Sequence, residues 1–217
     1  MARPARAASN VLRTGISTSL NTLDPLITTL GDEYVYDILV FNGLTRMREA
    51  LSIEPDLPES WTSSEDLTRW TFKLRRGVRF HNSREMVADD VVAVFRRLLD
   101  PATAAPSRSQ LGMVTAPDAA TVVFELNIPH SSLADTLCDR QVKITPRDAV
   151  ADLKTKPIGT GPFKFVIYTP GDRLVMARNP DYFEPGMSCR VRGDSRRAGF
   201  RQPIYDRRKT TNKQAPP

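Results

Sequence analysis

The spacing of hydrophobic residues along the chain predicts both helices and strands. Apolar and aromatic residues recur at helical intervals over residues 32–41, and Asn42-Gly43 follows as a helix end. Residues 69–74 instead alternate Trp, Phe and Leu with polar residues, which is the period of a half-buried strand. Residues 88–99 carry an apolar stripe at intervals of three and four, so we expect an amphipathic helix there.

The other predicted elements are shorter. They are strands at 10–16 and 121–126, helices at 131–138 and 147–153, and a hairpin of strands 163–168 and 174–177. Pro55 and Pro58 predict a turn, and Asn82 or Ser83 is the expected N-cap of the helix at 88–99. Helices and strands alternate irregularly and without repeats, so the expected fold class is mixed α and β (α/β in the broad sense).

The basic charge of the chain is concentrated at one end. The net charge is +6 and the isoelectric point is about 9.6. Nine of the 31 Lys and Arg residues, but only two of the 25 Asp and Glu residues, lie in 187–217, which leaves 22 basic and 23 acidic residues before them. A nucleic-acid binder needs a basic surface across its fold, so we expect a solvated tail and no nucleic-acid partner.

Catalytic and metal chemistry find little support in the sequence. His81 and His130 lie in different segments and have no partner at metal-ligand spacing, and Cys138 and Cys189 form no CxxC pattern. No nucleophile elbow or phosphate-binding loop is present, since Pro162 removes an amide donor after Gly159-Thr160-Gly161. We therefore expect no catalytic residues, no metal, no cofactor and no enzyme activity.

The N-terminal residues carry no recognisable export signal. Residues 1–15 contain Arg3 and Arg6 followed by small residues, and they lack the apolar core of a secretory signal. Either a signal was lost or never included, or the product stays in the cytoplasm. No run of 18 apolar residues predicts a transmembrane helix.

Several segments in fixed order resemble a known family. They are LDPLITT, EYVYDILVFNGLTR, IEPDLPESWTSSEDLTRWTFKLRRGVRFHNSREMVADDVV, PIGTGPFKF and RNPDYF. Together, over roughly residues 10–186, they resemble the peptide, dipeptide and nickel type of ABC-transporter solute-binding proteins, bacterial extracellular solute-binding protein family 5. One departure is that Asn82-Ser83 stands where the family has an acidic residue and Gly after the histidine.

The resemblance implies a periplasmic-binding-protein-like fold with two lobes. It places the first lobe at 10–186, with an inserted subdomain at about 50–146 and a returning hairpin at 157–186, after a flexible N-terminus at 1–9. Family members are considerably longer than 217 residues, so we expect the second lobe to be missing. Residues 187–217 are expected to be a disordered basic tail, either in frame or produced by a frame shift.

The resemblance also indicates where a solute would bind. The loop with Thr28, Thr29, Gly31 and Asp32 would lie at the ligand edge, where hydroxyls and free amides suit a polar ligand end. Thr160 and Gly161 would lie near the hinge. A plain helix-capping loop explains the first segment equally well, and turn formation alone explains the second.

The implied function is a solute-binding component of an ABC import system for peptides or related small solutes. Its partners would be the solute and an ABC permease in the membrane, its location periplasmic or extracytoplasmic, and its state monomeric. A lobe without its counterpart would bind weakly or not at all. The alternatives are a non-transport fragment or interaction protein retained in the cytoplasm, and a nucleic-acid binder acting through the basic tail.

Overall fold

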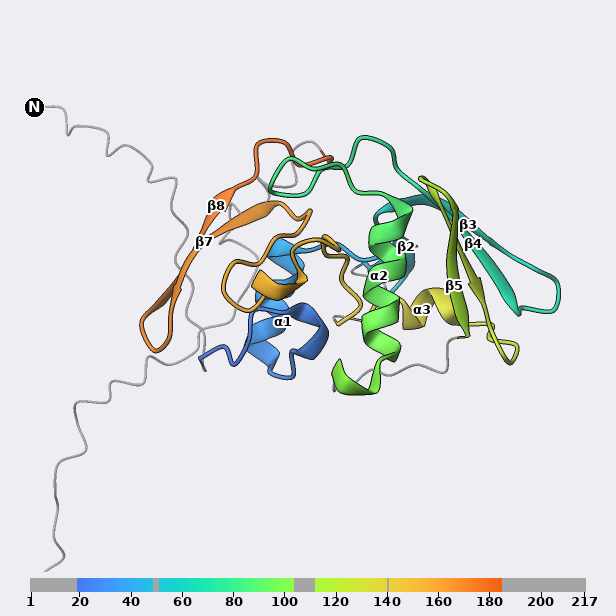
Figure 1. The fold of residues 1–217 in the computed structure, drawn as a ribbon, viewed down its shortest axis with the longest axis horizontal. Coiled ribbons are helices and arrows are strands. Elements are labelled where there is room, and N and C mark those ends of the chain that lie inside the picture. Colours follow the sequence, from blue (N-terminus) through green and yellow to red (C-terminus); the bar gives the residue numbers. More distant parts are fainter. Residues whose placement is uncertain (1–18, 49–50, 104–111, 140, 185–217) are drawn as a thin grey trace, which may run out of the picture.

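The computed structural model describes residues 19–48, 51–103, 112–139 and 141–184. Within these residues the helices and strands follow one another in this order: a 3-10 turn at Pro25–Ile27, α1 (Gly31–Val40), β1 (Thr45–Met47), β2 (Ile53–Pro55), β3 (Pro58–Ser63), β4 (Arg69–Leu74), α2 (Ala88–Leu99), a 3-10 turn at Pro101–Thr103, β5 (Met113–Asp118), β6 (Thr121–Glu125), α3 (Leu133–Thr136), a 3-10 turn at Val150–Asp152, β7 (Phe163–Thr169) and β8 (Arg173–Arg178). Figure 1 shows α1 with the β7–β8 hairpin at one end of the molecule and the largest sheet at the other.

The largest sheet is antiparallel, with strand order β3-β4-β6-β5. Strand β4 buries Trp70, Phe72 and Leu74 and leaves Arg69 and Lys73 exposed, as its alternating sequence predicts. Helix α2 packs against β5 and β6 and so covers one face of the sheet. The apolar stripe of this helix therefore explains why the sheet has a buried side.

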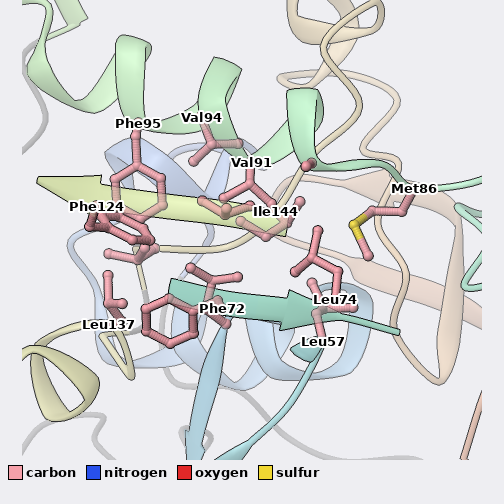
Figure 2. Close-up of a cluster of buried hydrophobic side chains, with 14 of the residues drawn as sticks. Leu57, Phe72, Leu74, Met86, Val91, Val94, Phe95, Phe124, Leu137 and Ile144 are labelled. Carbon is pink, nitrogen blue, oxygen red and sulfur yellow. The ribbon is translucent and has the colours of Figure 1, made fainter. Parts of the chain in front are cut away.

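The first core lies between α2 and the four-stranded sheet, with additional residues from the loops (Figure 2). Its centre is aromatic: the ring of Phe124 meets Phe72 at 5.4 Å and Phe95 at 4.9 Å between centroids, both edge to face. Leu57 and Ile144 reach it from segments outside the sheet. Its buried residues thus come from segments between Leu26 and Ile144.

The second core is smaller and lies between α1 and the hairpin. Its fully buried members come from α1 and the segments flanking it, namely Leu20, Leu23, Tyr36, Val40 and Phe41. The hairpin packs Phe165, Tyr168, Leu174 and Met176 against them. The two cores do not test the boundaries of the lobe and the inserted subdomain, which remain a prediction from the family resemblance.

The long predicted elements agree with the structure, and several short ones do not. Helix α3 makes a single turn rather than spanning 131–138, and the predicted helix at 147–153 is a 3-10 turn, since in each case only a few residues face a core. Pro55 ends β2 and Pro58 begins the edge strand β3, so the two prolines bracket the bend at residues 56 and 57, in agreement with the prediction. A strand end or edge tolerates the missing amide donor of proline.

The start of α2 also differs from the prediction. Its N-cap is Val87, whose backbone N–H is accepted by the carboxylate of Asp90, whereas Asn82 accepts the N–H of Arg84 in the preceding turn. The predicted strand at 10–16 and the tail at 187–217 lie outside the described residues. Among the helices of the described residues, none is long and apolar enough to cross a membrane.

Candidate functional site

The two segments predicted to bind a solute lie at opposite ends of α1. The loop of Thr28 to Asp32 leads into its first turn, whereas Gly161 donates its backbone N–H to Val40 O at the last turn, 2.9 Å away. A ten-residue helix is about 15 Å long. The structure therefore does not bring the two segments together into one site, and their ligand role remains a prediction.

The buried part of the first segment is Thr28. Its side chain is fully buried, and its hydroxyl lies 2.9 Å from Pro25 O and 3.0 Å from Asp37 Oδ2. Gln141 donates from its side-chain amide to the carbonyl of Thr28. Thr28 thus has internal partners and supports the loop from within, whereas Thr29 and Gly31 are exposed and Asp32 is partly exposed.

Glu33 organises the backbone of this loop. It is fully buried, and one carboxylate oxygen accepts the N–H groups of Thr29 and Leu30 at 2.7 and 2.8 Å. Its other oxygen accepts those of Asn21 and Thr22 at 2.8 and 3.3 Å. The expectation of free amides in this loop is therefore wrong for Thr29 and Leu30, whose donors are already satisfied by one carboxylate.

Asp37 is a second buried carboxyl group on α1. Burial raises its pKa to about 8, against the smaller opposing effects of the Thr28 hydroxyl and Lys143. The Thr28 hydroxyl lies within donating distance of both Asp37 Oδ2 and Pro25 O, and Asp37 Oδ1 is buried without a hydrogen-bond partner. Burial and the unpartnered oxygen both favour the protonated form of this carboxyl group.

The second segment, Gly159-Thr160-Gly161, packs against the backbone at the end of α1. A Cβ atom on Gly161 would lie 2.5 Å from Val40 C, and one on Gly159 would lie 2.0 Å from Val40 O. Both positions therefore require glycine for close approach rather than for a left-handed turn. Thr160 is also buried, and its hydroxyl donates to Asn42 Oδ1 at 3.0 Å.

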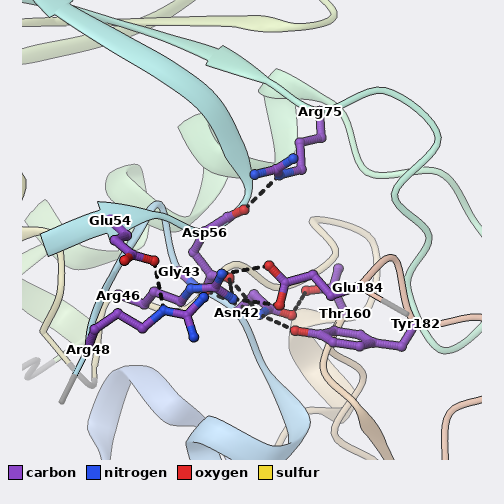
Figure 3. Close-up of polar contacts among 10 residues, drawn as sticks. All are labelled: Asn42, Gly43, Arg46, Arg48, Glu54, Asp56, Arg75, Thr160, Tyr182 and Glu184. Atoms are coloured by element: carbon purple, nitrogen blue, oxygen red, sulfur yellow. Dashed lines mark hydrogen bonds and ion pairs between the residues drawn. The ribbon is translucent and has the colours of Figure 1, made fainter. Parts of the chain in front are cut away.

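Asn42 connects four segments of the chain, and we call this group of contacts the Asn42 junction (Figure 3). Its side-chain amide donates to Asp56 at 2.9 Å and to the hydroxyl of Tyr182 at 3.2 Å. The backbone carbonyl of Asn42 accepts the N–H of Ile144. Asn42, two residues after the end of α1, thereby fixes the positions of the chain near residues 56, 144, 160 and 182.

The charges at the Asn42 junction compensate one another. Burial raises the pKa of Asp56, while Lys143, the Gly43 amide and Arg46 oppose that shift. Arg46 lies 3.5 Å from Asp56 and makes two short contacts with Glu184, at 2.6 and 2.8 Å. That hydrogen-bonded pair lowers the pKa of Glu184. Apart from the buried Nε of Arg46, which has no hydrogen-bond partner, the charges of the junction are paired within the protein, which favours a role in positioning the chain.

Most of these polar residues were missed by sequence reasoning. Asn42 was interpreted only as a helix end, and His81 as an isolated histidine, because their partners lie far away in sequence. Tyr182 belongs to the RNPDYF motif, which pointed to this region without giving a contact. Among residues 19–184 that the structure describes, no group of three His, Cys, Asp or Glu side chains is placed to hold a metal ion.

A family model matches most of the chain. The model of bacterial extracellular solute-binding proteins, family 5 Middle, matches residues 52–207. That match continues beyond Gly186, where the family-like motifs were expected to stop. It covers well over half of the 217 residues.

Curated relatives agree with this match. The chain is 32% identical to Di/tripeptide-binding protein 1 of Pseudomonas aeruginosa, covering 67% of this chain and 33% of that protein. It is 28% identical to the probable D,D-dipeptide-binding periplasmic protein DdpA of Escherichia coli, covering 82% of this chain and 37% of that protein. The chain spans about a third of the length of these relatives.

Solved structures show the same fold. A binding protein from A. tumefacien R10 in complex with agropinic acid matches with a TM-score of 0.74 and 29% identity, covering 78% of this chain and 36% of that one. The periplasmic binding protein DppA of Helicobacter pylori in complex with the peptide STSA matches with a TM-score of 0.72 and 28% identity, covering 77% and 39%. The mixed α and β fold is that of part of a periplasmic binding protein, and the chain belongs to the family 5 bacterial extracellular solute-binding proteins.

Proposed function

We propose that this chain forms the first lobe of a solute-binding protein that delivers peptides or related small solutes to an ABC importer, and that it has no enzyme activity. The observation that carries the proposal is the match of its fold and sequence to binding proteins for small peptides. The partners are the solute and an ABC permease, the location is extracytoplasmic, and the lobe acts as part of a monomer.

The contacts in the loop before α1 narrow the predicted binding residues. Thr28, Thr160 and Gly161 are buried and engaged inside the protein, so we assign them a supporting role. Thr29, Gly31 and Asp32 are the predicted residues that reach the surface. We propose that these three contribute to the ligand edge.

Tight binding requires the part of the family fold that lies outside this chain. Small-molecule sites typically bury about 70–90% of the ligand surface, and one wall of a cleft cannot do this. The relatives are about three times as long as the matched segment. We therefore infer that this chain alone binds solutes weakly.

Calorimetry with di- to pentapeptides tests this proposal on two proteins. The chain alone should give no binding heat at micromolar peptide, whereas a chimera carrying residues 19–184 in place of the matching segment of Di/tripeptide-binding protein 1 should bind dipeptides. Micromolar binding by the chain alone would remove the need for a second lobe. A chimera that unfolds cooperatively and binds none of the peptides would refute the solute-binding role.

A non-transport role is the second candidate, and one comparison favours it. The chain is 33% identical to the HTH-type transcriptional regulator SgrR of Shigella dysenteriae, covering 66% of this chain and 26% of that protein. A segment of this type therefore also occurs in a protein named as a regulator. Fractionation of the native host separates the two roles, because a cytoplasmic product argues against import.

A further inference from the structure

His81 connects the loop before α2 to the glycine-containing segment that packs on α1. Its Nε2 lies 3.0 Å from the carbonyl oxygen of Gly161, and its Nδ1 lies 3.3 Å from the backbone N of Gly159. A carbonyl can only accept a hydrogen bond and a backbone N–H can only donate one. The ring is therefore neutral, with its proton on Nε2 and a lone pair on Nδ1.

The backbone of His81 strengthens the same connection. Its N–H donates to the carbonyl of Gly159 at 2.9 Å, so residue 81 makes three contacts with the segment. On its other side the segment contacts α1 through the bond from Gly161 N–H to Val40 O, and Asn179 donates to Gly161 O at 3.0 Å. We call these contacts of His81 with residues 159–161 the His81 latch.

The His81 latch lies between the two cores. Val78 and Phe80, just before the histidine, belong to the first core, whereas Val40 and Phe41, against which Gly159 packs, belong to the second. A change in the charge of this ring therefore acts where the two cores are joined.

The charged groups around the ring favour its neutral state. The positive charge of Lys164 in β7 disfavours a charged ring, and its Nζ lies 3.7 Å from Asp181 Oδ2. In the loop that carries the histidine, Arg79 donates to Ser83 O and Arg84 pairs with Asp90 of α2. No carboxylate of the described residues is hydrogen-bonded to the ring. Burial, aided by Lys164 and opposed by the Gly161 bond, lowers the pKa of His81 to about 4.

We propose that the His81 latch is an acid-sensitive connection, in which the neutral ring holds residues 159–161 between the two cores and protonation of Nδ1 releases them. A proton on Nδ1 would place two N–H donors against each other at Gly159, and the new charge would face Lys164. The released ring would gain water as its partner. This device does not depend on the identity of the solute.

The size of the effect follows from the two protonation equilibria. An exposed histidine has a pKa of about 6.5, against about 4 in the latch. Between pH 7.5 and pH 5.0 this difference raises the opening equilibrium of the latch about 30-fold. The stability that the neutral ring gives to the closed latch is fully present above pH 6.5 and is lost as the pH falls toward 4.

The protonation state can be observed directly, because the chain has only two histidines. In ¹⁵N NMR of the native chain, His81 should show the neutral Nε2–H tautomer at pH 7.5. The Nδ1–H tautomer, or a ring that titrates near pH 6.5 without any change at residues 159–161, would overturn the proposal. This measurement needs no variant and so does not depend on the folding of one.

Amide hydrogen exchange tests the release. The protection factor of the Gly159 amide, which donates to His81 Nδ1, should fall about 30-fold from pH 7.5 to 5.0, while the amides of β4 keep theirs. His81→Gln should show reduced protection of Gly159 at both pH values and no pH step. The control His130→Gln, at a partly exposed site away from residues 159–161, should behave like the native chain at Gly159. A native protection factor that is unchanged between the two pH values would refute the latch.

Discussion

Replacing Glu33 by Gln should greatly destabilise the part of the protein around α1. The carboxylate accepts four backbone N–H groups at 2.7 to 3.3 Å, two on each oxygen. Glutamine keeps one oxygen, and its NH₂ group must face the two N–H donors that the other oxygen accepted. The substitution therefore removes two bonds and places donors against donors in a fully buried site.

The expected magnitude follows from those two lost bonds. A hydrogen bond to a charged acceptor contributes about 1.5–3 kcal/mol, so losing two costs about 3–6 kcal/mol. A domain of this size is stable by about 5–15 kcal/mol in total. Glu33→Gln should thus leave the second core close to unfolding, whereas the four-stranded sheet retains all its contacts.

Urea unfolding followed by far-ultraviolet circular dichroism measures this loss. Trp61 and Trp70 both belong to the first core, so their fluorescence monitors the other end of the molecule in the same experiment. Glu59→Gln, on the exposed face of the edge strand β3, is the matched control and should change the free energy of unfolding by less than about 0.5 kcal/mol. A loss below about 1 kcal/mol for Glu33→Gln would show that the four bonds do not hold the loop.

Three further substitutions have definite expected results. Asp37→Asn should raise stability at pH 8 and above, because the native carboxyl has a pKa of about 8 in the folded protein and 3.8 as a model group, so the native chain loses stability as the pH rises from about 4 to 8. Equal pH profiles of the free energy of unfolding for both proteins would contradict this. Gly161→Ala should cost about 1–3 kcal/mol or more because its Cβ would meet the backbone of α1, whereas Gly31→Ala, with nothing within 4 Å of its Cβ, should not lower the melting temperature. Asp90→Asn should cost about 1.5–3 kcal/mol, because it removes the charge of the buried carboxylate that accepts from Arg84, a partly exposed side chain that also lies 3.3 Å from Asp148; thermal melts within one degree of the native chain would refute that estimate.

Local pattern was sufficient to predict the elements that pack by one face. The ends of β4 and α2 agree with the predicted ranges, because their apolar residues recur at the period of a strand and a helix and those residues form the first core. The short strands β1 and β2 were missed, since three residues are too few to show a period. Their pairing depends on contacts that local sequence does not contain.

The candidate site could be predicted only in part for the same reason. Thr28 and Thr160 attracted attention as hydroxyls in loops, yet both are buried and bonded within the protein. Glu33 and Asn42 look like ordinary helix residues, because their partners lie in other segments. A resemblance to a family indicates which segments recur, but it does not show which side chains are satisfied internally.

The Asn42 junction also sets the order in which the molecule can fold. The contact from Asn42 to Tyr182 spans 140 residues, and the pair of Arg46 with Glu184 spans 138. The four strands and α2 of the first core need no residue beyond 144, so they can assemble while the rest is still being made on the ribosome. Helix α1 is synthesised before them, but the junction and the hairpin that cover it arrive last. One of the first helices to leave the ribosome is therefore among the last to reach its final surroundings.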